Sequence, residues 1–143
     1  MEHEAPEEFE TLIIGAGFSG LAAAIELKNS GRESFLILES APEVGGTWRD
    51  NVYPGCACDV PSNLYSYSFA PRPDWSRVYP RQTEILDYLK DCVRRFDLGD
   101  RIRFGHEIVE ATFAEADGRW QLRTGGGKTY RARVIVAATG PLN

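Results

Sequence analysis

Two short apolar runs near the beginning of the chain predict two strands. Residues 11–14 and 35–38 are almost entirely Leu, Ile, Phe and Thr, a composition typical of buried strands. Between them, apolar side chains recur at helical spacing from Leu21 to Leu27, and Gly31 is placed to end a helix. The pattern therefore predicts a strand, a helix and a second strand within about thirty residues.

A second amphipathic pattern predicts a helix over residues 82–98. Its apolar residues fall on one helical face, and they are Ile85, Leu86, Leu89, Val93 and Phe96. Gly99 follows as a stop signal, and we interpret Cys92 as a packing residue.

Strand patterns return after this helix. Residues 102–104 predict a short strand. Three alternating segments then predict a small antiparallel meander: residues 108–114, 120–124 and 129–132. Glycine-containing turns separate them at residues 117–118 and 125–127. Phe113 and Trp120 are most simply the packing residues of this meander.

The last apolar run, residues 134–138, is continuous and not alternating. Such a run is typical of a strand buried on both faces of a parallel sheet. The whole pattern indicates an α/β fold, with a parallel sheet, crossover helices and a small antiparallel β-meander.

The segment between residues 40 and 81 has no clear periodicity. It is rich in proline, glycine and aromatic residues, and a loop of this length is usually functional or disordered. Its aromatic content argues against disorder. Two interpretations stay open, namely an excursion that packs on itself and a wall around a large flat ligand.

Length and charge narrow the class of protein. The chain has 143 residues and a formal net charge of −5, which fits one folded domain and does not favour nucleic-acid binding. We expect a loose tail over residues 1–8 and a single domain over residues 9–143. No apolar run is long enough to cross a membrane, and the polar N-terminus is unlike a signal peptide. We therefore expect a cytoplasmic protein.

The cysteines do not suggest a metal centre or a disulfide framework. There are three of them, Cys56, Cys58 and Cys92, and the histidines are His3 and His106. No second ligand pair accompanies Cys56 and Cys58, so no metal site is expected. One residue separates these two cysteines, whereas redox pairs usually have two intervening residues.

The glycines after the first predicted strand indicate a dinucleotide site. Gly15, Gly17 and Gly20 follow the pattern G-x-G-x-x-G between a strand and a helix. Gly15 allows a tight turn, Gly17 lets a pyrophosphate approach the backbone, and Gly20 lets the helix pack closely on the strand. The helix points free N–H groups and a positive dipole end at the phosphates. The alternative is an ordinary glycine turn.

Glu39 follows the second predicted strand. A carboxylate there can accept hydrogen bonds from both hydroxyl groups of a ribose, and it would repel a 2′-phosphate. We therefore expect this site to hold FAD or NAD and not NADP.

Two further motifs carry a resemblance to a known family. Ala138-Thr139-Gly140 ends the last predicted strand. A second set has fixed spacing and consists of Gly45, Gly46, Thr47, Trp48, Tyr53, Pro54, Gly55 and Asp59. With these motifs, the chain resembles the N-terminal part of a two-dinucleotide flavoprotein of the glutathione-reductase structural type. The second set is similar to the signature of Baeyer–Villiger monooxygenases, and the resemblance implies a Rossmann-like FAD-binding domain.

The resemblance also implies a role for each matching residue in binding FAD. The residues around the pyrophosphate would be Gly15, Gly17, Ser19 and Gly20. Glu39 would hold the adenosine ribose, and the backbone of Ile108 would meet the adenine.

On the flavin side, the implied residues are Gly46, Thr47 and Trp48, with Asp59 and Tyr65 near the flavin and nicotinamide. Asp59 would also help to position an active-site arginine. The simpler alternatives are a turn-capping acid for Asp59 and loop packing for Trp48 and Tyr65.

The chemistry of the family follows from the same resemblance. NADPH reduces FAD, O2 then gives a C4a-peroxyflavin, and this species converts a ketone to an ester or lactone. The NADPH domain and the active-site arginine are not found in this sequence. We therefore expect a fragment of a longer enzyme that cannot turn over by itself.

Two other functions stay open. One is a flavin monooxygenase that oxygenates nitrogen or sulfur, and the other is a non-catalytic FAD-binding module. The sequence pattern specifies no oligomeric state.

Overall fold

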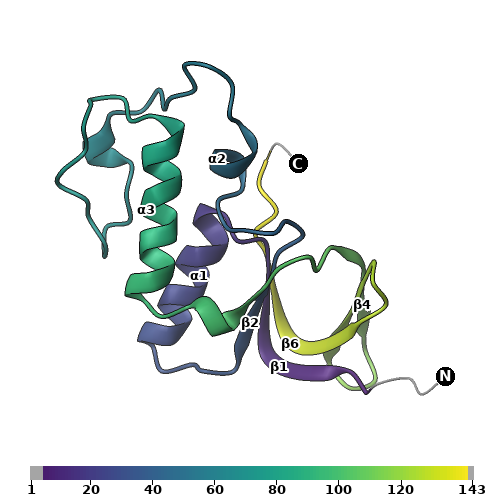
Figure 1. The fold of residues 1–143 in the computed structure, drawn as a ribbon. Coiled ribbons are helices and arrows are strands. Elements are labelled where there is room, and N and C mark those ends of the chain that lie inside the picture. Colours follow the sequence, from purple (N-terminus) through teal and green to yellow (C-terminus); the bar gives the residue numbers. More distant parts are fainter. Residues whose placement is uncertain (1–4, 142–143) are drawn as a thin grey trace.

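The structure is a computed structural model that describes residues 5–141 (Figure 1). Within these residues, six strands form one sheet in the order β3-β2-β1-β6-β5-β4. The strands are β1 (Glu7–Ile14), β2 (Phe35–Leu38), β3 (Ile102–Arg103), β4 (Ile108–Ala114), β5 (Arg119–Thr124) and β6 (Thr129–Ala137). The α-helices are α1 (Phe18–Asn29), α2 (Thr47–Asp50) and α3 (Gln82–Arg95). None of the helices in the described part of the chain could span a membrane.

The predicted strand-helix-strand unit is confirmed. β1 pairs in parallel with β2 and with β6, which places Thr11 beside Phe35 on one side and Val134 on the other. The crossover helix α1 buries Leu21 and Ile25 against the sheet. Parallel neighbours require such a crossover, so α1 determines the direction of β2.

The predicted meander is also present. β4, β5 and β6 pair in antiparallel order, and Phe113 lies opposite Trp120 with ring centroids 5.3 Å apart. The expectation of separate strands over residues 129–132 and 134–138 is wrong, because β6 is one continuous strand. Its ladder with β1 continues on both sides of the polar Arg133, so that residue does not interrupt the strand.

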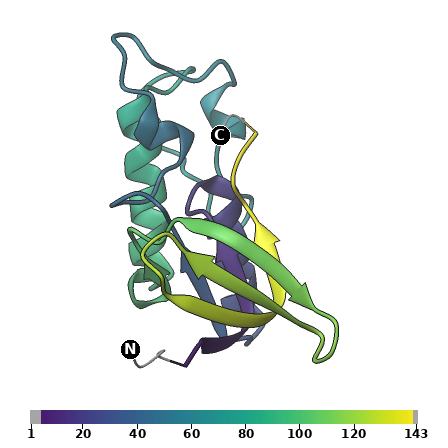
Figure 2. The same ribbon diagram turned by 90° about the vertical axis from the view of Figure 1, so that its right-hand side faces the viewer.

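The elements are arranged in layers around two cores. Helices α1 and α3 lie on one side of β1 and β2, and the meander lies on the other (Figures 1 and 2). The core between strands β1 and β2 and the meander consists of Leu12, Leu36, Leu38, Leu122, Tyr130 and Ala132. Ile13 and Ile37 point the opposite way, into the core beneath the helices. Alternation along two strands therefore supplies both cores.

The expected N-terminal tail is wrong in its last residues. β1 begins at Glu7, so Glu7 and Glu8 belong to the sheet. The Glu7 carboxylate accepts hydrogen bonds from Arg103, and Arg131 donates to Glu8 at 2.8 Å. Because Arg103 and Arg131 are far from Glu7 and Glu8 in the sequence, no local sequence pattern indicates that the strand begins at Glu7. Residues 1–4 of the expected tail lie outside the described residues.

The expected burial of β6 on both faces is also wrong. Val134 is 51% exposed. β5 pairs with β6 only as far as Ala132, so the rest of β6 has β1 as its neighbour in the described sheet. A strand at such an edge leaves part of its apolar surface uncovered.

The segment over residues 40–81 packs on itself and against α3. The backbone N–H of Cys58 donates to the carbonyl of Pro80 at 2.9 Å. The rings of Tyr67 and Phe69 stack at 4.9 Å, and the Tyr88 hydroxyl of α3 accepts the Tyr67 N–H at 2.8 Å. The segment also includes α2, which the sequence analysis does not predict. Whether this segment also forms a wall around a ligand, the other open interpretation, depends on where the residues of α2 and its neighbours lie relative to a cavity.

Candidate functional site

The connection from β1 into α1 requires glycine at two positions, one in the turn and one in the first turn of α1. Gly15 has a φ of +104°, and a Cβ there would lie 2.3 Å from the carbonyl oxygen of Ala138. A Cβ on Gly20 would lie 1.8 Å from the carbonyl oxygen of Gly15. The predicted reasons for these glycines, a tight turn and close helix packing, are thus visible in the geometry.

The first turn of α1 leaves backbone N–H groups available. Gly17 is the N-cap and makes no side-chain capping hydrogen bond. The first hydrogen bond of the helix runs from the N–H of Leu21 to the carbonyl of Gly17, so the preceding N–H groups have no acceptor within the helix. These N–H groups lie at the edge of a cavity, where an anion can accept hydrogen bonds from them.

This cavity, which we call the glycine-turn cavity, has a volume of about 620 Å³. It lies where the carboxyl ends of β1, β2 and β6 meet, the usual ligand position in such sheets. Segments far apart in sequence line it, and they include Gly15–Ser19, Leu38–Ser40, Gly45–Asp50, Tyr65, His106–Ile108 and Ala138–Pro141. In Figure 1 the chain leaving β6 runs towards α2.

The carboxylate of Glu39 holds the turn from the side of β2. Its side chain is buried. Oε2 accepts the backbone N–H of Ala16 at 2.7 Å, and Oε1 accepts the N–H of Ala41 at 2.9 Å. The Arg49 guanidinium lies 3.4 Å from Oε1. Glu39 therefore joins the end of β2 to the glycine turn and carries a compensated negative charge.

Trp48 and Tyr65 form an aromatic edge of the cavity. The indole N–H of Trp48 donates to the Tyr65 hydroxyl at 3.0 Å, and the rings meet edge to face. Burial raises the pKa of Tyr65, the hydrogen bond from Trp48 opposes this, and nearby Cys58 and Asp59 raise it further. The hydroxyl therefore stays neutral across the physiological range.

Most of the predicted site residues line this one cavity: Gly15, Gly17, Ser19, Glu39, Gly46, Thr47, Trp48, Tyr65 and Ile108. Two do not. Gly20 lies behind the turn, where it touches Gly15. Asp59 is exposed on a bend after Cys58, outside the lining residues. The roles of all these residues in binding and catalysis stay predictions.

Several lining residues were not predicted from the sequence, among them Ser40, Arg49 and His106. Arg49 directly follows the predicted Trp48, and Ser40 directly follows Glu39, so proximity to a motif was the available signal. No sequence signal pointed to His106, because its position depends on how the loop between β3 and β4 folds. The backbone N–H of His106 itself donates to the carbonyl of Glu39 at 2.9 Å.

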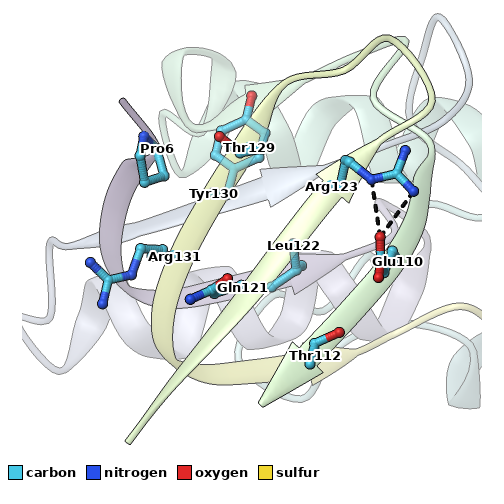
Figure 3. Close-up of a pocket in the computed structure, with 9 residues that line it drawn as sticks. All are labelled: Pro6, Glu110, Thr112, Gln121, Leu122, Arg123, Thr129, Tyr130 and Arg131. Carbon is cyan, nitrogen blue, oxygen red and sulfur yellow. Dashed lines mark hydrogen bonds and ion pairs between the residues drawn. The ribbon is translucent and has the colours of Figure 1, made fainter. Parts of the chain in front are cut away.

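A second cavity of about 540 Å³ lies at the meander, and we call it the meander cavity (Figure 3). Its lining residues are Pro6, Glu110, Thr112, Gln121, Leu122, Arg123, Thr129, Tyr130 and Arg131. Arg123 pairs with Glu110 at 2.9 Å, and Arg131 pairs with Glu8 at 2.8 Å. No predicted site residue lies there.

Three features of the structure together define a class of protein. They are a glycine turn that opens a helix, an acidic residue at the end of the next strand, and a cavity at the strand ends. They are the features of a dinucleotide-binding domain of the Rossmann type. A family model described as an NAD(P)-binding Rossmann-like domain matches residues 13–81.

Individual proteins and solved structures match this chain over more of its length than that family model does. A Baeyer-Villiger monooxygenase of Streptomyces coelicolor is 48% identical over 99% of this chain, which covers 27% of that protein. A FAD-binding monooxygenase of Aspergillus niger is 46% identical over 78% of this chain and 19% of its own length. The solved structure of cyclohexanone monooxygenase from Rhodococcus sp. Phi1, bound to NADP+, has a TM-score of 0.90 at 37% identity, over 95% of this chain and 26% of that one.

The chain is therefore homologous to Baeyer–Villiger monooxygenases, and the predicted resemblance and Rossmann-like fold are confirmed. It spans between about a fifth and about a quarter of the length of these relatives.

Proposed function

We propose that this chain is the FAD-binding part of an NADPH- and O2-dependent monooxygenase that converts ketones to esters or lactones. The observation that carries the proposal is the glycine-turn cavity, in which the start of α1 and the carboxylate of Glu39 meet. The homology to Baeyer–Villiger monooxygenases supports the reaction class. Turnover is assigned to the longer parent protein, which would supply the NADPH domain.

The cavity has the features that an extended dinucleotide requires. The N–H groups at the start of α1 suit a pyrophosphate, and Gly17 leaves room for it to approach the backbone. Glu39 suits the adenosine ribose, and Ile108 lies on the same side at the start of β4. Trp48 and Tyr65 offer an aromatic edge for the flavin. Bound FAD would supply the electron transfer and the oxygen chemistry.

Asp59 has a different place in the proposal. It is exposed and does not line the cavity. Its carboxylate would hold an arginine from another part of the parent protein next to the flavin. That arginine would stabilise negative charge that develops during the reaction.

The proposal includes a cytoplasmic location. Cys56, Cys58 and Cys92 are all free, and a reducing compartment keeps thiols in this state.

The test is to incubate the purified chain with FAD, remove free cofactor and record the visible absorbance. We expect a retained flavin band with resolved fine structure, which ADP displaces because it competes for the pyrophosphate and ribose positions. A 2′-phosphorylated ADP should compete about tenfold less well, since Glu39 repels the extra phosphate. A colourless protein would contradict FAD binding by these residues, and equal competition by both nucleotides would contradict the role of Glu39.

A further inference from the structure

Arg49 is a cationic residue of the glycine-turn cavity that neither sequence motif explains. Within residues 5–141, it is the lysine or arginine that lines this cavity, whereas Glu39, Asp50 and Glu107 line it with acidic side chains. An FAD pyrophosphate would add further negative charge. The guanidinium of Arg49 therefore supplies the positive charge that offsets these negative groups within the cavity.

The neighbour of Arg49 that matters most is Glu39. The side chains of Arg49 and Glu39 are 14% and 6% exposed, and Nη1 lies 3.4 Å from Oε1. A carboxylate removed from water to this extent needs a compensating charge or several donors. The backbone N–H groups of Ala16 and Ala41 supply two donors, and Arg49 supplies the charge.

The guanidinium is itself held in place. Nη1 donates to the carbonyl of Glu43 at 2.8 Å, while Nε and Nη2 form a two-pronged contact with Asp50 at 2.8 and 3.1 Å. Burial lowers the pKa of Arg49, but the hydrogen bond to Asp50 and the charges of Glu39 and Asp50 outweigh it and raise that pKa. Arg49 is therefore a permanent cation with a fixed direction.

The backbone around Arg49 is shaped to bring it there. Gly45 has a φ of +129°, and a Cβ on it would lie 3.0 Å from the Cβ of Arg49 and 2.5 Å from Leu86. The N–H of Gly45 donates to the carbonyl of Ala16 at 3.0 Å, and the N–H of Ala16 donates to Glu39. Arg49, Glu39, Ala16 and Gly45 thus form a closed ring of contacts between α2, β2 and the glycine turn.

We infer that Arg49 is a positioning residue for ribose recognition. By pairing with Oε1, it keeps the Glu39 carboxylate aimed across the cavity, where a ribose can donate to it. Arg49 itself acts through Glu39 and needs no contact with the dinucleotide. This inference rests on the proposed binding of FAD.

The experiment is a double-mutant cycle on FAD affinity, measured by fluorescence titration of the 143-residue chain. Arg49→Met should weaken FAD binding by about 10- to 100-fold, the range for leaving a buried charged group without one of its partners. Arg49→Lys keeps the charge without the planar fork, so it should recover part of the loss. In a Glu39→Gln background, Arg49→Met should add less than about threefold, because the charge it compensates is gone.

The matched control is Arg94→Met, which removes another arginine that pairs with an acid, Asp91, at 3.1 Å on exposed surface of α3. It should leave FAD affinity within about twofold of the unmodified chain. A thermal unfolding curve of each variant separates folding from binding, and Arg49→Lys remains informative if Arg49→Met does not fold.

Three results would overturn the inference, and they are distinguishable. If the unmodified chain does not bind FAD, the proposed function fails and the inference fails with it. If it binds and neither Arg49→Met nor Arg49→Lys weakens binding, only the inference fails. If Arg49→Met weakens binding equally in the unmodified chain and in the Glu39→Gln background, Arg49 acts independently of the carboxylate.

Discussion

The glycine-turn cavity and the meander cavity differ little in volume, at about 620 and 540 Å³. They differ greatly in how their polar groups are used. At the meander, charged side chains from neighbouring strands pair across the sheet, as Arg123 does with Glu110. At the glycine turn, the carboxyl ends of three parallel strands, β1, β2 and β6, meet at the cavity. The backbone N–H groups at the start of α1 have no side-chain cap there. Available hydrogen-bonding capacity, and not volume, distinguishes a binding site.

The comparison also separates two kinds of glycine. Gly20 is needed because backbone occupies the space where a side chain would be. Gly118, in the turn between β4 and β5, has a φ of +65°, and a Cβ on it would have no neighbouring atom within 4 Å. One glycine is required by contact and the other by backbone conformation alone.

The largest effect we expect is from Gly20→Ala. The added methyl would collide with the carbonyl oxygen of Gly15, so we expect a loss of about 2–3 kcal/mol in the free energy of unfolding and a loss of FAD binding. Gly118→Ala should cost only about 1 kcal/mol and leave FAD binding unchanged. Urea unfolding and FAD titration of both variants measure this, and similar losses in both would remove the distinction.

A smaller effect should follow from Glu39→Gln. The amide keeps the size of the side chain but loses the negative charge and one acceptor for the donors around it. We expect FAD affinity to fall by about tenfold or more. Glu110→Gln makes the same change in the meander cavity and should leave FAD affinity unaltered. If both substitutions weakened FAD binding alike, the two cavities would not differ in function.

The smallest effect concerns the Glu7–Arg103 pair beside the meander. A hydrogen bond from Arg103 lowers the pKa of Glu7. A carboxyl group whose pKa is lowered by folding stabilises the protein above its unfolded pKa, and the contribution is lost as the pH falls through its folded pKa. Because both side chains are partly exposed, Arg103→Met should cost at most about 1 kcal/mol at pH 7.

The measurement for this pair is urea unfolding at pH 7 and at a series of lower pH values, along which the stability difference between the variant and the unmodified chain should shrink as Glu7 takes up a proton. FAD affinity at pH 7 should not change, since the pair lies outside the glycine-turn cavity. A difference in stability that persisted at low pH would assign the effect to the packing of Arg103 over Tyr130.

The sequence predicted what depends on local spacing. The first strand-helix-strand unit, the meander and the helix α3 each have a period or a turn signal that needs no distant partner. The predicted end of that helix, residue 98, is wrong by three residues, because α3 ends at Arg95. Gly15 and Gly17 could be placed at the cavity for the same reason, because their spacing already implies a turn before a helix.

What the sequence missed depends on distant contacts. Glu7 and Glu8 join β1 because Arg103 and Arg131 reach them from other strands. Val134 is exposed because β5 ends its pairing at Ala132. Arg49 was overlooked because its partner Glu39 is ten residues away across a turn, at no spacing that a helix or a strand would indicate.

The contact between Gly17 and Gly46 limits how this chain can change over evolutionary time. A Cβ on Gly46 would lie 3.3 Å from the Cα of Gly17, and one on Gly17 would lie 3.7 Å from the Cα of Gly46. The two turns come from different motifs but rest directly against each other. A mutation that enlarges one turn alters the space open to the other, so the mutational histories of the two motifs are coupled.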